Sequence, residues 1–229
     1  MSATGPADPK QKFDEYAQSY DGLHKQSISA SGEPTEYFAE YKLGCLRRLG
    51  VGRESAVLDF GCGIGNLTEQ LVREIDVVHG FDPSDRSLET CQRRAPSAVL
   101  HTSEDAIPDA GFDFAVLSGV LHHVAKQERV DLLRRVAGKL RPGGRVVIFE
   151  HNPLNPLTLK AVNDCPFDDD AVLLWPWEVK ELVKYAGYGD VRLDYIVFFP
   201  RALSPLRPLE PRLRHVLLGA QTMTIATRS

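Results

Sequence analysis

The segment VLDFGCGIGNLT, residues 57–68, constrains the fold of this chain more than any other feature. It begins with apolar residues typical of a buried strand, and Asp59 interrupts them near the strand's end. Three glycines then follow at alternate positions, Gly61, Gly63 and Gly65, before a helical pattern opens. Glycines permit positive φ angles and let a ligand approach the backbone, because they carry no Cβ. With the positive end of a helix dipole behind them, they predict an adenosine-containing ligand that has an anionic end.

Strand and helix patterns alternate from this segment to residue 150. The run FDFAVLSGV at 112–120 is almost continuously apolar, which is typical of a parallel strand buried on both faces. This alternation predicts an α/β fold with a mostly parallel sheet and helices on both faces. The other strands are expected near 77–81, 98–100 and 145–150, with helices at 66–75, 84–94 and 128–140.

Right-handed crossovers place the carboxyl ends of such strands on one edge of the sheet. Ligands of open α/β sheets bind at that edge. The loops that follow the strands should therefore converge on one pocket. They are 59–65, the loop at Asp82, 102–105, 118–123 and 150–155.

The N-terminal segment, residues 1–50, precedes the first strand and is interpreted as a helical lid. Its two helical patterns lie at 13–20 and 35–49. An aromatic stripe on such a helix is a common core feature, but it also suits a lid. Tyr16 and Tyr20 are the candidate residues that would cover the cofactor or substrate.

The ligand-binding domain is predicted to span residues 51–229. It should contain a loop-rich insert at 151–174 and a Pro- and Arg-rich insert at 201–219. The β-like segments at 191–200 and 220–229 flank the second insert. They predict an antiparallel strand pair at one edge of the sheet.

Composition limits the possible classes of function. The net charge of −4 and the pI of about 6.0 argue against nucleic-acid binding. No apolar run approaches the roughly 18 residues that span a bilayer, and the first residues lack the apolar core of a signal peptide. The four cysteines include no CxxC pair, which disfavours a zinc site or a disulfide framework. We therefore expect a cytoplasmic monomer or homodimer with no nucleic-acid, membrane or metal partner.

Asp82 lies 21 residues after Gly61, at the end of the second expected strand. A carboxylate at this place accepts hydrogen bonds from a ribose diol, although a helix cap is the alternative. Dinucleotide-binding turns use the spacing G-x-G-x-x-G, whereas here the glycines alternate and Asp59 precedes them. An acid at that point repels a pyrophosphate and attracts a ligand ammonium group. An NAD-dependent oxidoreductase is thus disfavoured.

Four motifs resemble those of class I S-adenosylmethionine-dependent methyltransferases, in the family's order over residues 55–150. They are VLDFGCGIGNLT, GFDPS, FDFAVLSGVLHHV and LRPGGRVVIFE, and FDEYAQSYD resembles the N-terminal helix of the family's small-molecule branch. The resemblance implies a Rossmann-like, seven-stranded, mostly parallel sheet. It also implies S-adenosyl-L-methionine as the cofactor, S-adenosyl-L-homocysteine as the product, and a small-molecule acceptor.

The resemblance also implies roles for individual residues. Asp59, Gly61, Gly63 and Gly65 would hold the methionine end of the cofactor. Asp82 would hold the ribose, and Ser118 would lie near the sulfonium. The residues expected around the adenine are Pro83, Ser84, Thr102, Ser103, Glu104 and Asp105.

The acceptor atom stays open among oxygen, nitrogen and carbon, with a hydroxyl of a sugar, polyketide or other secondary metabolite favoured. A hydroxyl needs a base, and histidine is the usual choice near neutral pH. His151 is the first candidate, followed by His122 and His123, of which at most one is expected to face the pocket. Asn152 and Asn155 are candidate acceptor contacts, or turn residues beside prolines. A protein that binds the cofactor without catalysis, as a sensor or partner subunit, is the alternative function.

Overall fold

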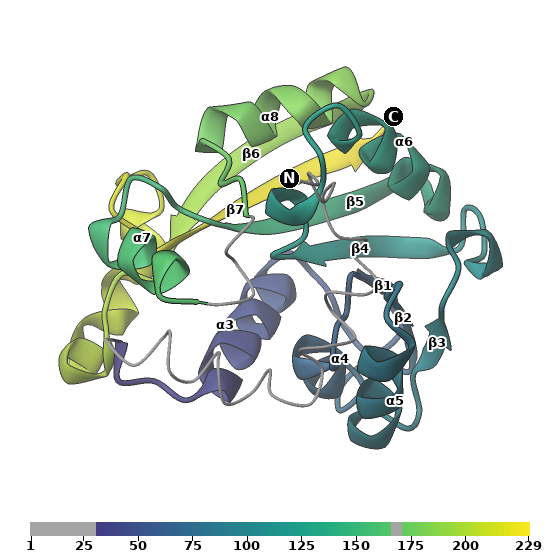
Figure 1. Ribbon diagram of the computed structural model, residues 1–229, viewed down its shortest axis with the longest axis horizontal. Coiled ribbons are helices and arrows are strands. Elements are labelled where there is room, and N and C mark those ends of the chain that lie inside the picture. The colour runs from purple at the N-terminus through teal and green to yellow at the C-terminus, as the bar shows by residue number, and fades with distance from the viewer. Residues whose placement is uncertain (1–30, 166–170) are drawn as a thin grey trace, which may run out of the picture.

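The computed structural model describes residues 31–165 and 171–229, and its centre is a seven-stranded sheet (Figure 1). The strand order is β3-β2-β1-β4-β5-β7-β6. β7 is antiparallel to both of its neighbours, while the other pairs are parallel. The predicted mostly parallel sheet with an antiparallel C-terminal pair is therefore confirmed. The strands are β1 (Ala56–Phe60), β2 (Val77–Phe81), β3 (Val99–His101), β4 (Phe112–Ser118), β5 (Leu140–His151), β6 (Tyr188–Ile196) and β7 (Gln221–Arg228).

Helices cover both faces of this sheet. α3 packs beside α4, and α6 packs beside α8 and the strands β4 and β5. The α-helices are α3 (Thr35–Arg48), α4 (Asn66–Leu71), α5 (Asp85–Arg94), α6 (Arg129–Lys139), α7 (Pro156–Asn163), α8 (Pro176–Tyr185) and α9 (Glu210–Leu213). Short 3₁₀-helices are η2 (Glu104–Ala106), η3 (Leu121–His123) and η5 (Arg201–Leu209).

The alternation of side chains along each strand divides the core into two layers. Leu58 of β1 and Leu117 of β4 pack in the cluster that includes Leu133 of α6. Val57 and Val116, each one residue earlier, pack in the opposite cluster beneath α3 and α4. Both faces of β1 and β4 are thus buried, which explains why their sequences are continuously apolar.

Several element boundaries differ from the sequence prediction. The segment 151–174 was expected to be loop-rich, but it contains α7. Asn155 caps this helix and Pro156 occupies its first turn, which is a favourable helix start that the neighbouring prolines obscured. α4 ends at Leu71, earlier than predicted, and His122 and His123 lie in a 3₁₀-helix. The helix predicted at 13–20 lies outside the described residues.

The insert 201–219 is joined to α3 through the buried carboxylate of Glu210. Tyr41 of α3 donates its hydroxyl hydrogen to Glu210 Oε2 at 2.5 Å, and the backbone N–H groups of Phe198 and Phe199 donate to Oε1 at 3.0 Å. Burial, followed by the bond to Glu210, raises the pKa of Tyr41. Among the described residues, no helix is both long and apolar enough to cross a bilayer.

Replacement of Glu210 by alanine should destabilise the fold by about 2–4 kcal/mol, because three partly buried donors would lose their acceptor. Urea unfolding followed by circular dichroism measures the change. Glu210→Gln, which keeps one acceptor oxygen, should lose less, and the exposed Glu40→Ala on α3 should change the unfolding midpoint little. Equal stability of Glu210→Ala and the wild type would show that this carboxylate does not hold the insert.

Candidate active site

The turn between β1 and α4 needs its three glycines for different reasons. All have positive φ angles, +80° at Gly61, +52° at Gly63 and +87° at Gly65. A Cβ on Gly61 would lie 2.6 Å from Val120 Cγ2, and one on Gly65 would lie 2.7 Å from Cys91 Sγ. A Cβ on Gly63 would meet no atom of residues 31–165 or 171–229 within 4 Å. Packing therefore requires Gly61 and Gly65, whereas Gly63 borders a space that the described part of the chain leaves open.

Asp82 ties this turn to the end of β2. Its Oδ2 accepts a hydrogen bond from the Gly63 N–H at 2.9 Å, and its Oδ1 accepts one from the Ser84 N–H at 2.9 Å. Ser84 provides the helix cap, since its Oγ accepts a hydrogen bond from the Ser87 N–H at the start of α5. The Asp82 carboxylate is consequently fixed beside the open space at Gly63.

Asp59 is buried at the end of β1, with 1% of its surface exposed. Its Oδ2 accepts a hydrogen bond from Thr68 Oγ1 at 2.7 Å. Burial raises the pKa of the Asp59 carboxyl to about 6, although the Thr68 bond and the charge of Lys42 oppose the shift. A carboxylate in such surroundings gains strongly from a cationic partner, which is the property needed to receive a ligand ammonium group.

Lys42 reaches the same edge from α3 and was not identified from the sequence. Its Nζ donates a hydrogen bond to Ser118 Oγ at 2.6 Å, at the end of β4. Burial lowers the pKa of Lys42 to about 8, and the charges of Asp59 and Glu150 oppose that shift. The contact joins residues 76 positions apart, so no local pattern could have revealed it.

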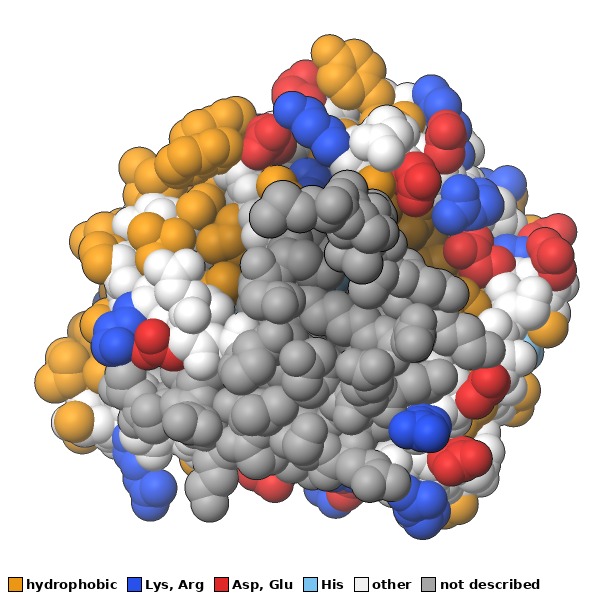
Figure 2. All heavy atoms as spheres, in the orientation of Figure 1, with side chains coloured by type: hydrophobic (Ala, Val, Ile, Leu, Met, Phe, Trp, Pro, Cys, Tyr) orange, Lys and Arg blue, Asp and Glu red, His pale blue; other side chains and the backbone are white. Residues whose placement is uncertain are grey.

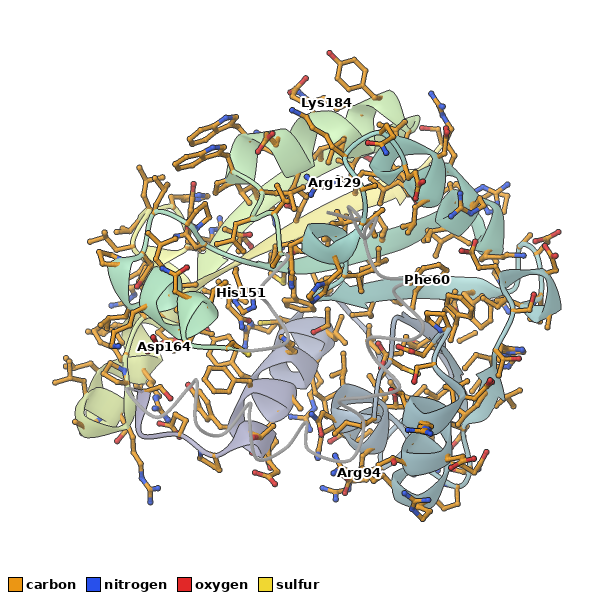
Figure 3. The ribbon with its side chains drawn as sticks, viewed as in Figure 1. Phe60, Arg94, Arg129, His151, Asp164 and Lys184 are labelled. Atoms are coloured by element: carbon orange, nitrogen blue, oxygen red, sulfur yellow. The ribbon has the colours of Figure 1, made fainter. Side chains whose placement is uncertain are left out.

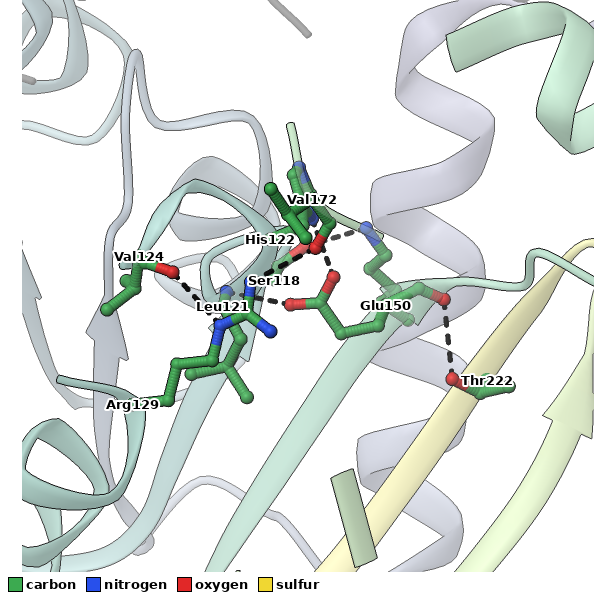
Figure 4. A network of polar contacts seen from close by, with 9 residues as sticks. Ser118, Leu121, His122, Val124, Arg129, Glu150, Val172 and Thr222 are labelled. Atoms are coloured by element: carbon green, nitrogen blue, oxygen red, sulfur yellow. Dashed lines mark hydrogen bonds and ion pairs between the residues drawn. The ribbon is translucent and has the colours of Figure 1, made fainter. Parts of the chain in front are cut away.

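The three histidines predicted as candidate bases lie together. The ring centroids of His122 and His123 are 4.2 Å apart, and those of His122 and His151 are 5.2 Å apart. His122 Nδ1 lies 2.6 Å from Glu150 Oε2, with both side chains 2% exposed (Figure 4). Glu150 Oε1 accepts a hydrogen bond from the Leu121 N–H at 2.8 Å. His151, the last residue of β5, completes this cluster (Figure 3).

Glu150 keeps its negative charge although it is buried. Burial alone would raise the pKa of its carboxyl, but the charges of His122 and His151 and the bonds from His122 and Leu121 lower it overall. An ionised Glu150 stabilises positive charge on the imidazoles beside it. A histidine that accepts a proton here therefore has a fixed counter-charge.

Arg129 joins the end of η3, which carries His122 and His123, to the segment before α8. Its Nε donates to the Val124 carbonyl at 2.9 Å and its Nη2 donates to the Val172 carbonyl at 3.1 Å (Figure 4). The Val172 N–H donates in turn to the His122 carbonyl at 2.9 Å. These bonds position His122 through its backbone as well as through Glu150.

The residues expected around the adenine surround η2 and the start of α5. Asp105 donates its backbone N–H to Ser103 Oγ at 3.3 Å, which stabilises the turn itself. Glu104 forms an ion pair with Arg135 of α6, with Nε 2.6 Å from Oε2. Thr102 is exposed and Pro83 is half-buried. The contact of this group with an adenine ring stays a prediction.

Asn152 and Asn155 join the end of β5 to the segment before β7 by hydrogen bonds. Asn152 is fully buried, and its Nδ2 donates to the carbonyls of Leu217 and Gly219 at 2.8 and 2.7 Å. Asn155 Nδ2 donates to the Leu218 carbonyl at 2.7 Å. Both amides thus have structural partners, and their contact with an acceptor stays a prediction.

The lid and the metal expectations concern other parts of the chain. Tyr16 and Tyr20 lie outside the described residues, so their role as a lid stays a prediction. Within residues 31–165 and 171–229, no three His, Cys, Asp or Glu side chains are arranged to hold a metal ion.

Asp59→Asn should stabilise the ligand-free protein above pH 6. The folded state keeps a proton on Asp59 up to about pH 6, whereas the unfolded chain releases it near 3.8. The free energy of unfolding therefore falls between about pH 4 and 6. Above that range it stays lower than at pH 4, by up to about 3 kcal/mol. A neutral amide at this position avoids this loss of stability. The gain is reduced because Lys42 then lacks the negative charge beside it.

Urea unfolding at pH 8 and at pH 4 tests this prediction. We expect a higher midpoint for Asp59→Asn at pH 8 and little difference at pH 4. The exposed Asp76→Asn is the control and should change neither midpoint much. A variant less stable than the wild type at pH 8 would contradict the raised pKa.

Comparison with known families and proteins agrees with this geometry. Residues 58–148 match the model of a methyltransferase domain. An uncharacterised methyltransferase of Geobacillus is 29% identical over 143 residues, which cover 60% of this chain and 65% of that protein. A trans-aconitate 2-methyltransferase of Mycolicibacterium gilvum is 31% identical over 155 residues, covering 65% of this chain and 60% of that protein. The matches thus span a little under two thirds of these relatives' length.

Solved structures share the fold over most of the chain. A methyltransferase from Thermotoga maritima, described as a possible histamine N-methyltransferase, has a TM-score of 0.70 at 21% identity and covers 97% of this chain and 100% of its own. Phosphoethanolamine N-methyltransferase 2 of Haemonchus contortus, in complex with S-adenosyl-L-methionine, has a TM-score of 0.67 at 16% identity, covering 98% of this chain and 60% of its own. Residues 58–148 thus match a methyltransferase domain, and the chain shares the fold of solved S-adenosylmethionine-dependent methyltransferases.

Proposed function

We propose that the protein transfers a methyl group from S-adenosyl-L-methionine to a hydroxyl of a small-molecule acceptor, such as a sugar, a polyketide or another secondary metabolite. The observation that carries this proposal is the cluster of His122, His123 and His151 around Glu150. This cluster lies at the same edge of the sheet as the glycine turn. A hydroxyl must lose its proton during transfer, whereas a neutral amine can attack without a base, so the cluster favours oxygen over nitrogen.

The charges at this edge fit the cofactor. Open space at Gly63 lies beside the Asp82 carboxylate, which can accept hydrogen bonds from the ribose hydroxyls. Asp59 offers a negative charge for the ammonium group of the methionine end, and Lys42 offers a positive charge for its carboxylate. When bound, the cofactor supplies an electrophilic methyl group, and the protein supplies alignment and a dry site.

His151 takes the proton of the acceptor hydroxyl. It is half-buried, whereas His122 is almost fully enclosed and already contacts Glu150 through Nδ1. The Glu150 carboxylate stabilises the imidazolium that forms on His151. The two groups interact, because the charge of the His151 ring lowers the pKa of Glu150. His122 acts as a positioning residue that holds Glu150 in place.

Gly63→Ala should weaken S-adenosyl-L-methionine binding at least tenfold, about 1.4 kcal/mol, because its Cβ would project into the space assigned to the ligand. Gly143→Ala is the matched control. Gly143 also has a positive φ angle, +77°, and a built Cβ there meets no described atom within 4 Å, but it lies in the first part of β5. Both variants should lose similar stability, about 1 kcal/mol, and only Gly63→Ala should lose affinity in calorimetry. Equal affinities would remove the ligand from this turn.

His151→Ala should lower turnover by about 10²–10⁴-fold, the usual contribution of a general base, with cofactor affinity unchanged. The assay uses a hydroxyl compound that supports turnover in a screen of methyl acceptors. Wild-type kcat should rise with pH as the imidazole loses its proton, and this limb should disappear in His151→Gln. The exposed His215→Ala is the control. Unchanged turnover in His151→Ala would assign the base elsewhere or show that the acceptor needs none.

A further inference from the structure

The edge of the molecule formed by α7 and the insert 201–219 exposes a group of large aliphatic side chains. Each of the eight has between 38% and 61% of its surface exposed. Figure 2 shows hydrophobic side chains gathered along the left side of the molecule, over the region of α7 and η5. We call this group the apolar rim: Leu157, Leu159, Leu203, Leu206, Leu209, Val216, Leu217 and Leu218.

The 3₁₀-helix η5 arranges three of these residues as a stripe. A 3₁₀-helix has three residues per turn, so side chains three positions apart lie above one another. Leu203, Leu206 and Leu209 follow this spacing and are all exposed, although a kink falls at Leu203. A leucine face that is exposed to water gains no hydrophobic stabilisation, so this face suits a partner that covers it.

The rim is held in a fixed position by polar contacts beneath it. Glu210 binds Tyr41 and the backbone before η5, and Arg207 pairs with Glu33 and lies over the Tyr37 ring, 4.4 Å from its centroid. On the other side, Thr158 of α7 donates its hydroxyl hydrogen to the Ala220 carbonyl at 2.8 Å. The leucines are therefore presented by a braced scaffold.

The insert that carries most of the apolar rim is also positively charged. The insert 201–219 contains four arginines and one glutamate, a balance of +3 in a chain whose net charge is −4. Its one carboxylate, Glu210, is buried, whereas Arg201, Arg212 and Arg214 are exposed. Within the described residues, no ion pair joins these three arginines to a carboxylate. Exposed leucines beside unneutralised arginines complement a surface that is apolar inside and anionic outside.

We propose that the apolar rim docks this protein onto an anionic lipid bilayer surface, with the leucines entering the headgroup–acyl boundary and the arginines meeting the lipid phosphates. Interfacial helices combine an apolar face with basic residues in this way, and each basic residue near an anionic surface adds to binding. A second copy of the chain fits less well, because a two-fold contact through the rim would bring the same arginines together. The expectation of no membrane partner rested on the absence of a spanning segment, which does not bear on surface docking.

Co-sedimentation of the full chain with vesicles tests the proposal. Vesicles of phosphatidylglycerol and phosphatidylcholine in equal parts should bind the protein at least about tenfold more strongly than phosphatidylcholine alone, and added salt should weaken the binding. The double variant Leu206→Ser/Leu217→Ser and the double variant Arg212→Glu/Arg214→Glu should each lose at least about tenfold.

Matched controls lie at the other end of the sheet. Val99 of β3 and Arg93 of α5 are exposed, and Val99→Ser/Arg93→Glu should bind vesicles as the wild type does. All variants should keep wild-type cofactor affinity, which separates this test from that of the proposed function. The proposal is wrong if the wild type ignores anionic vesicles or if the rim variants bind them equally well. A rim-dependent dimer in ultracentrifugation without vesicle binding would assign the surface to a second copy instead.

Discussion

The charge balance among Asp59, Lys42 and Glu150 is the constraint on which the site depends. All three groups belong to different elements, β1, α3 and β5, and meet where the parallel strands end. Burial raises the pKa of Asp59 and lowers that of Lys42, so each group is costly to ionise without a partner. A ligand that carries both an ammonium and a carboxylate would supply opposite charges to both groups. The ligand-free site therefore carries the cost of two poorly solvated charges, and ligand binding would lower that cost.

The end of β5 connects the proposed chemistry to the proposed docking surface. His151 closes the strand within the histidine cluster, and Asn152, the next residue, holds the carbonyls of Leu217 and Gly219. The rim is therefore anchored one residue away from the candidate base. An acceptor located at a lipid surface would meet the protein on the side where β5 ends.

Much of this arrangement could be predicted from the sequence, for identifiable physical reasons. The strands β1 and β4 are buried on both faces, so their apolar runs were clear, and the alternate glycines marked the turn. The helix α7 does not stand out in the loop-rich segment 151–174, because prolines such as Pro153 are typical of loops, although Asn155 and Pro156 form a favourable helix start. Lys42 could not be predicted, since its importance arises from a contact with Ser118 that only the folded chain creates. The partner of His122, Glu150, is likewise 28 residues away in sequence.

Proton exchange on cofactor binding tests the charge balance most directly. Calorimetry of S-adenosyl-L-methionine binding in buffers of different ionisation enthalpy measures the number of protons taken up or released. The ligand ammonium should lower the pKa of Asp59 and the ligand carboxylate should raise that of Lys42. We therefore predict proton release near pH 6 and proton uptake near pH 8, with the release lost in Asp59→Asn. Binding without proton exchange at either pH, or no binding by the wild type, would contradict the account.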